Sequence, residues 1–258
     1  MTHHPTRLLQ GLLSLAALLL MAPASAWDSG CRYSADRRAS MESAGAKRIV
    51  VIARAGDLEV RPATGTVVQG TGKACASREG FLRDLQVVTR RDGDVIYLEA
   101  RMPGEIKGIG LFYAYLDLEV EVPAGIPVAI QDSSGDIEAH DVWIVQVTDS
   151  SGDIVLNRVS GDLEISDSSG DINVSRATGR VQVQDSSGDI RIAGARDVVI
   201  PSDSSGDITI EHVTGEVRID QDSSGDIGIV DVGRNVQLLS DTSGEVKLSR
   251  VKGTVRLP

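Results

Sequence analysis

The stretch Asp132-Ser133-Ser134-Gly135-Asp136-Ile137 decides the fold because the chain repeats it. The same six residues begin again at Asp149, Asp167, Asp185, Asp203 and Asp222, and Asp241-Thr-Ser-Gly-Glu-Val is a relaxed seventh copy. Successive copies start 17, 18, 18, 18, 19 and 19 residues apart. A short fixed period of this kind is typical of repeat proteins, in which each unit stacks on its neighbours.

Each repeat contains two short runs in which apolar residues alternate with polar ones. In one copy the apolar positions are Ile208 and Ile210, then Val213, then Val217 and Ile219. Alternation with β-branched residues predicts strands that are buried on one face. A second turn, often Thr-Gly or Ser-Gly, separates the two runs, so each repeat reads as strand, turn, strand, turn.

Two arrangements fit this pattern, a stack of parallel coils and a meander of antiparallel hairpins. Stacking places like residues on like, which explains why the same residues recur at every turn, whereas a meander does not. We therefore predict an all-β protein, a β-solenoid of stacked two-strand coils with about 18 residues per coil and mostly parallel pairing. Its core must consist of Val, Ile and Leu, because aromatic residues make up only 3% of the chain.

Two copies depart from the pattern. The first copy is one residue short and carries Val142-Trp143-Ile144-Val145, and the fourth has Pro201 where the others place an apolar residue. Proline cannot donate a hydrogen bond to a sheet, so we expect the strand pairing to be bulged or reshaped at both places.

The regions before the repeats have other characters. Residues 1–26 read as a signal peptide, with Arg7, an apolar run from Leu8 to Met21 and a small-residue cleavage motif before Trp27. We predict an N-terminal tail at 27–46, an irregular β cap at 47–125 and the seven-coil solenoid at 126–258. Within the cap, Gly56-Asp57 and Gly93-Asp94 echo the repeat.

Charge and export limit the partners. Without the signal peptide the chain has 25 basic and 37 acidic residues, a net charge of −12. Because nucleic acid binding needs a basic surface, we expect no nucleic acid partner. No later segment is apolar enough for a membrane span. The expected location is the periplasm, the cell surface or the exterior, with an unidentified protein or cell-surface partner.

The two cysteines, Cys31 and Cys75, both follow the signal peptide. An even pair in an oxidising compartment predicts a disulfide. A redox or metal pair is the alternative, but the spacing is not CxxC and no histidine is near.

Stacking would align two columns of acids. The first-Asp column contains Asp132, Asp149, Asp167, Asp185, Asp203, Asp222 and Asp241, and the second-Asp column contains Asp136, Asp153, Asp171, Asp189, Asp207, Asp226 and Glu245. One interpretation is turn chemistry, with the first Asp accepting hydrogen bonds from following amides and serine hydroxyls bridging coils. The other is a calcium site made by Asp149, Asp153, Asp167, Asp171, Asp185, Asp189, Asp203 and Asp207.

A catalytic role fits these acids poorly. Paired carboxylates suggest glycoside hydrolysis, but a catalytic pair is a unique irregularity in a cleft, and here seven equivalent pairs are expected on a solvated edge. The mature chain has only His140 and His212, at unrelated repeat positions. We therefore predict no enzyme and no cofactor, with a polysaccharide-active β-helix enzyme as the weaker alternative. Tyr113 and Tyr115, on the outward phase of a strand, form a candidate contact site.

The run Leu118-Glu-Val-Glu-Val-Pro-Ala-Gly, followed by the Ser-Ser-Gly-Asp-Ile turns, resembles a bacterial family of unknown function labelled "putative adhesin". The resemblance extends from about Lys47 to the end of the chain. It implies an exported β-solenoid and brings no catalytic residues. The leading hypothesis is a non-catalytic structural or interaction protein of the cell envelope or surface, and the alternative is a calcium-dependent binding module.

Overall fold

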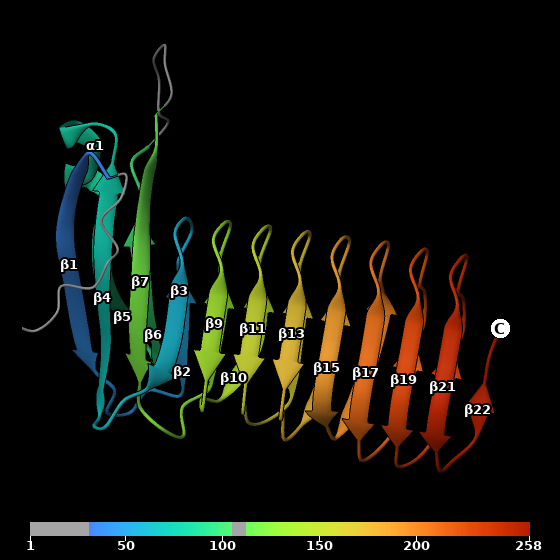
Figure 1. Cartoon of the computed structure of the whole chain (residues 1–258). Helices are drawn as coiled ribbons and strands as arrows, with labels where there is room; N and C mark the ends of the chain where they lie inside the picture. The colour runs from blue at the N-terminus through green and yellow to red at the C-terminus, as the bar shows by residue number, and fades with distance from the viewer. Residues whose placement is uncertain (1–30, 105–111) are drawn as a thin grey trace, which may run out of the picture. The chain divides into compact units, whose positions relative to one another are not determined.

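The computed structural model describes residues 31–104 and 112–258 (Figure 1). The predicted signal peptide lies outside these residues. The chain divides into two units, Met1–Gly30 and Cys31–Pro258, and all of the described residues belong to the second. Within the described residues, no helix is both long and apolar enough to cross a membrane.

The repeats form coils that place one strand in each of two sheets. In the first sheet the strands are β9 (Ile137–His140), β11 (Ile154–Asn157), β13 (Ile172–Ser175), β15 (Ile190–Ala195), β17 (Ile208–Val213), β19 (Ile227–Val232) and β21 (Val246–Val251). In the second they are β8 (Val128–Gln131), β10 (Ile144–Thr148), β12 (Leu163–Ser166), β14 (Arg180–Gln184), β16 (Asp197–Ser202), β18 (Val217–Ile219), β20 (Val236–Leu238) and β22 (Val255–Arg256).

Every pair of neighbouring strands in this part is parallel, and the buried aliphatic residues of one strand pair with those of the next. Ile172 of β13 pairs with Ile190 of β15, and Ile190 pairs with Ile208 of β17. The β-solenoid is therefore confirmed, and the antiparallel meander is excluded.

The core lies between the two sheets and is made of stacked aliphatic side chains. Ile154, Ile172, Ile190 and Ile208 are all fully buried. In the described part of the chain, the buried apolar residues are Ile, Leu, Val, Ala and Cys75, with no aromatic ring among them. Layers of like side chains fill the narrow space between the sheets without aromatic rings, in agreement with the low aromatic content.

Both irregular copies are bulged as predicted. The pairing of β10 with β8 shifts register between Ile144 and Gln146, beside Trp143. The pairing of β14 with β16 shifts between Gln182 and Gln184, opposite Pro201. Each shift absorbs a local irregularity, and the stacking continues beyond it.

The N-terminal region completes both sheets. It contains β1 (Tyr33–Glu42), β2 (Arg48–Ile52), β3 (Leu58–Pro62), β4 (Val67–Ala76), α1 (Glu79–Asp84), β5 (Gln86–Asp92), β6 (Val95–Arg101) and β7 (Ala114–Val122). Strands β2 and β3 stack in parallel on β8 and β9, whereas β1–β4, β4–β7 and β5–β6 pair antiparallel. Each sheet has eleven strands.

Two expectations for this region need correction. Residues 33–42, expected within a tail, form strand β1, because Ala35, Ala39 and Met41 turn one side toward the protein while pairing with β4. Gly93-Asp94 is the hairpin turn between β5 and β6 rather than a coil turn. Gly56-Asp57, in contrast, stacks directly on the first repeat turn, and the Gly56 amide donates to the Ser134 carbonyl at 3.1 Å.

Replacing Ile190 by Asp tests this layout. The change puts an unpaired carboxylate in the fully buried aliphatic stack of the middle coil, and we expect a loss of more than about 4 kcal/mol in the free energy of unfolding. Urea unfolding followed by circular dichroism measures it. Thr209→Asp is the matched control, because Thr209 is on the neighbouring strand, faces outward and pairs with Arg191. Equal stability of the two variants would contradict the assignment of the core.

Candidate functional site: the stacked repeat turns

The Asp-Ser-Ser-Gly-Asp turns form a row along one edge of the solenoid (Figure 1). Backbone hydrogen bonds join each turn to the next. The Gly170 amide donates to the Ser187 carbonyl at 3.0 Å, and the Ile172 amide donates to the Asp189 carbonyl at 2.8 Å. The hydrogen bonds between parallel strands of successive coils thus continue through the turns.

Glycine at the fourth position is required for two reasons. Gly170 and Gly188 have φ values of +130° and +137°, a region that other residues rarely adopt. In addition, a Cβ on Gly188 would overlap the carbonyl oxygen of Gly170 in the preceding coil. Any side chain here would push the coils apart.

The serine hydroxyls bridge successive coils, as turn chemistry predicts. The second Ser of one turn donates to the carbonyl of the first Ser in the preceding turn. Ser169 Oγ donates to the Ser150 carbonyl at 3.0 Å, and Ser224 Oγ donates to the Ser204 carbonyl at 3.2 Å. These hydroxyls are therefore part of the stack.

The second-Asp column also holds the coils together. Oδ1 of Asp153, Asp171 and Asp189 accepts the backbone N–H of the next member of the column, at 2.9, 3.0 and 2.8 Å. The same bonds continue through Asp207 and Asp226 to the Glu245 amide. Asp57 extends the ladder into the N-terminal region, where it accepts from the Asp136 amide at 3.2 Å.

The first-Asp column is buried, and the expectation of a solvated edge is wrong for it. The exposed fraction of its first six members is between 0 and 8%. Three of them accept an amide from the following serine, as in the 2.6 Å bond from the Ser186 amide to Asp185 Oδ1. The chain turns these carboxyls inward, next to the ends of the aliphatic layers.

Burial changes the acidity of this column. Desolvation is the main cause that raises the pKa of Asp132 and Asp149 to about 6 and that of Asp203 to about 7. The neighbouring carboxyls of the column raise it further, and nearby serine amides lower it in part. Burial also raises the pKa of Asp167, Asp185 and Asp222.

The eight aspartates proposed as a calcium site therefore divide into two environments. Asp149, Asp167, Asp185 and Asp203 are buried. Asp153, Asp171, Asp189 and Asp207 lie on the turn and accept backbone amides. In residues 31–104 and 112–258, no group of three or more His, Cys, Asp or Glu side chains is arranged to hold a metal ion.

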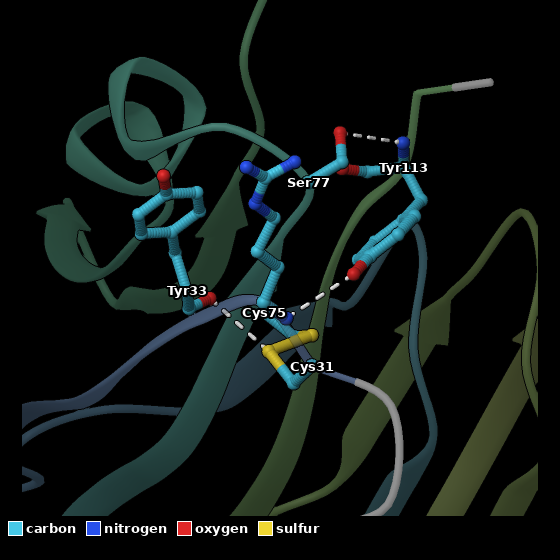
Figure 2. Close-up of a disulfide and its surroundings, with 6 residues drawn as sticks. Cys31, Tyr33, Cys75, Ser77 and Tyr113 are labelled. Carbon is cyan, nitrogen blue, oxygen red and sulfur yellow. Dashed lines mark hydrogen bonds between the residues drawn. A yellow bond between two sulfur atoms is a disulfide. The ribbon is translucent and has the colours of Figure 1, made fainter.

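Cys31 and Cys75 form a disulfide that ties the start of β1 to the end of β4 (Figure 2). Tyr113 stands beside it, where its hydroxyl accepts the Arg32 amide at 3.2 Å and its own amide donates to Ser77 Oγ at 3.1 Å. The rings of Tyr113 and Tyr115 are 6.3 Å apart. Tyr113 thus links the segments before β1 and after β4, while 37% of its surface stays exposed.

Sequence reasoning missed a left-handed position at the end of the first strand of each coil. Its members have φ between +53° and +62° although they are not glycine: Asp141, Arg158, Arg176, His212, Asp231 and Arg250. Gly194 occupies the equivalent place in the fourth coil. Their constant spacing of nine residues after the first Asp is the signal that could have revealed them. Arg158 forms a two-pronged ion pair with Asp141 of the preceding coil, with both bonds at 2.6 Å.

Trp143 is the second feature missed as a candidate. It belongs to the irregular first copy, is 38% exposed and lies against Gly161 of the next coil. It forms one wall of a hollow of about 170 Å³ that is also lined by Pro62, Pro123 and Asp141. This is an exposed aromatic surface beside prolines and a carboxylate.

The geometry defines a β-solenoid repeat protein whose repeated turn residues serve the stacking of its own coils. The family model described as Toastrack DUF4097 matches residues 38–200 and again 140–257, and the chain belongs to this family. No protein of curated function matches it.

Solved structures with a similar fold share little sequence with the chain. A putative cell adhesion protein from Clostridium sporogenes is 12% identical, with a TM-score of 0.46 over 88% of this chain and 100% of that one. A putative adhesin from Bacteroides fragilis is 15% identical, with a TM-score of 0.49 over 88% and 98%. A putative lipid binding protein from Parabacteroides distasonis is 14% identical, with a TM-score of 0.44 over 85% and 96%.

Replacing Gly188 by Ala tests the role of the turn. The added methyl group would occupy a strained backbone conformation and overlap the carbonyl of Gly170, so we expect a loss of at least about 2 kcal/mol in unfolding free energy. Gly228→Ala is the control, because Gly228 lies in β19 and its nearest neighbouring atom would be 4.0 Å away. That variant should stay within about 1 kcal/mol of the parent. Similar losses in both variants would refute the close-stacking argument.

Proposed function

We propose that this protein is a non-catalytic, exported interaction scaffold of the cell envelope or surface. The observation that carries the proposal is that the repeated polar side chains of the turns form hydrogen bonds to neighbouring coils. The second-Asp carboxylates accept backbone amides of the next coil, and the hydroxyls of the second serines donate to carbonyls of the preceding coil. The repeated Asp and Ser residues, which could be mistaken for a repeated active site, thus stabilise the stacking of the coils.

Family membership and the sequence of residues 1–26 support this role. The family is one of unknown function, and its match brings no catalytic set. The signal-like start of the chain supports export. The two histidines that follow it lie apart, His140 on β9 near Glu59 and His212 near the end of β17, which disfavours a shared catalytic centre.

The partner-facing surface is proposed to include the flat outer faces of the sheets and the hollow at Trp143. Val155 of β11 is 40% exposed, and Gln182 faces outward from the other sheet between buried Val181 and Val183. Flat regular faces of this kind offer repeated polar contacts to another protein or to a surface polymer.

Photo-crosslinking in intact cells tests the proposal. A photoreactive amino acid is placed in turn at Trp143, Val155 and Gln182, and crosslinked products are identified by mass spectrometry. We expect a reproducible product whose yield depends strongly on the position, because a specific partner contacts one face and not all. Failure to obtain a product at any of the three positions, or equal unspecific products at all three, would contradict an interaction role.

Calcium dependence separates this proposal from the calcium-binding alternative. Because Asp153, Asp171 and Asp189 already accept backbone amides and their first-Asp partners are buried, we expect the same thermal midpoint in calcium and in EDTA. The measurement is a thermal melt followed by circular dichroism at constant ionic strength. A midpoint that rises with calcium concentration would favour the alternative function.

A further inference from the structure

The first-Asp column places six carboxyl groups in line inside the protein. Asp132, Asp149 and Asp167 are 8, 3 and 6% exposed, and Asp185, Asp203 and Asp222 are 2, 1 and 0% exposed. Only the last member, Asp241 in the relaxed copy, is half-exposed. Backbone bonds fix the register, since the Asp203 amide donates to the Gln221 carbonyl at 2.9 Å and the Asp222 amide to the Ser240 carbonyl at 3.0 Å.

Many oxygens of this column have no hydrogen-bond donor. Oδ2 of Asp149, Asp167 and Asp185 is buried without a partner. Both oxygens of Asp132, Asp203 and Asp222 are buried without a well-formed hydrogen bond, although serine amides of the same turns lie near enough to lower their pKa. Buried polar atoms in folded proteins are almost always paired, and an unpaired carboxylate oxygen is especially unfavourable. The column therefore needs a partner that its protein neighbours do not supply.

The charged side chains that shift the pKa of the first-Asp column are other carboxylates. Its members raise one another's pKa, and Asp136, Asp153 and Asp171 of the second-Asp column add to the effect, as does Asp241 at the end. Serine amides of the same turns are the groups that oppose it. Full ionisation would place like charges in successive coils with little solvent between them.

We propose that the first-Asp column is a proton-binding site in which adjacent carboxyls share hydrogen-bonded protons at mildly acidic pH. The O–H of a protonated carboxyl donates to an unpartnered oxygen of the next coil. Each bound proton removes one charge and satisfies two otherwise unpaired oxygens. A proton is the ligand that suits this place, because it needs no cavity and no third coordinating side chain.

The consequence is a solenoid that acid stabilises. Unfolded aspartates titrate near the ordinary value of 3.8, whereas folding raises the pKa of Asp203 to about 7 and that of Asp149 to about 6. The folded state therefore holds more protons than the unfolded state between about pH 4 and pH 7. Its stability must fall as the pH rises through this window, and lowering the pH from 8 to 5 must raise it.

Two readouts test the proposal. Infrared spectroscopy of the folded protein at pH 6 should show the C=O stretch of protonated carboxylic acids, which disappears on unfolding. The thermal midpoint should be several degrees higher at pH 5 than at pH 8. In Asp203→Asn the difference should shrink and the midpoint at pH 8 should rise, because the amide is uncharged and donates to Asp185 or Asp222.

Controls separate the column from other titrating groups. Asp207→Asn removes one charge from the second-Asp column and should leave the difference between pH 5 and pH 8 unchanged. Asp185→Asn replaces Asp203→Asn if the latter does not fold. A missing carboxylic acid band at pH 6, stability that is flat or rises from pH 5 to pH 8, or equal effects of Asp203→Asn and Asp207→Asn would overturn the proposal. So would a requirement for calcium or sodium at pH 8.

Discussion

The close approach of one turn backbone to the next is the constraint on which the whole structure depends. Gly188 stacks on Gly170 so tightly that only hydrogen fits at the Cα, and this contact recurs in every repeat. Because each turn is fixed on its neighbour, the strands on both sides pair in parallel and in register. The isoleucines that follow each turn then stack as continuous columns, which is where the apolar burial that stabilises the protein arises.

Stacking identical residues in successive coils is favourable for aliphatic side chains, but for charged side chains it causes repulsion. Charges of one sign at a coil spacing of about 4.8 Å repel by about 3.5 kcal/mol at an effective dielectric of 20. In the second-Asp column this repulsion is offset by hydrogen bonds from backbone amides and, at Asp189, by a 2.6 Å ion pair with Arg191. The first-Asp column has fewer donors and is buried, and its raised pKa follows from that difference.

The repeat made the fold predictable because spacing and alternation are local properties of the sequence. Strand positions, parallel stacking, the serine bridges and both bulges could all be read from it. The inward turn of the first Asp could not, since Asp-Ser-Ser-Gly is also the composition of a solvated turn and burial depends on how the coil closes. Strand β1 was missed because its partner β4 is far along the chain. Arg158 and Arg176 were missed because arginine rarely adopts a left-handed conformation.

An engineered disulfide tests the in-register parallel stack most directly. Arg191 and Thr209 are paired across β15 and β17 and both face outward, and Thr209 pairs in turn with Gly228 of β19. Cysteines at 191 and 209 would lie at a separation that a disulfide can bridge, whereas cysteines at 191 and 228 would be two coils apart, about 9.6 Å. Mass spectrometry of the oxidised monomers should find the new bond in the first double variant and not in the second. A bond between 191 and 228, or no bond between 191 and 209, would contradict the stacked-coil structure.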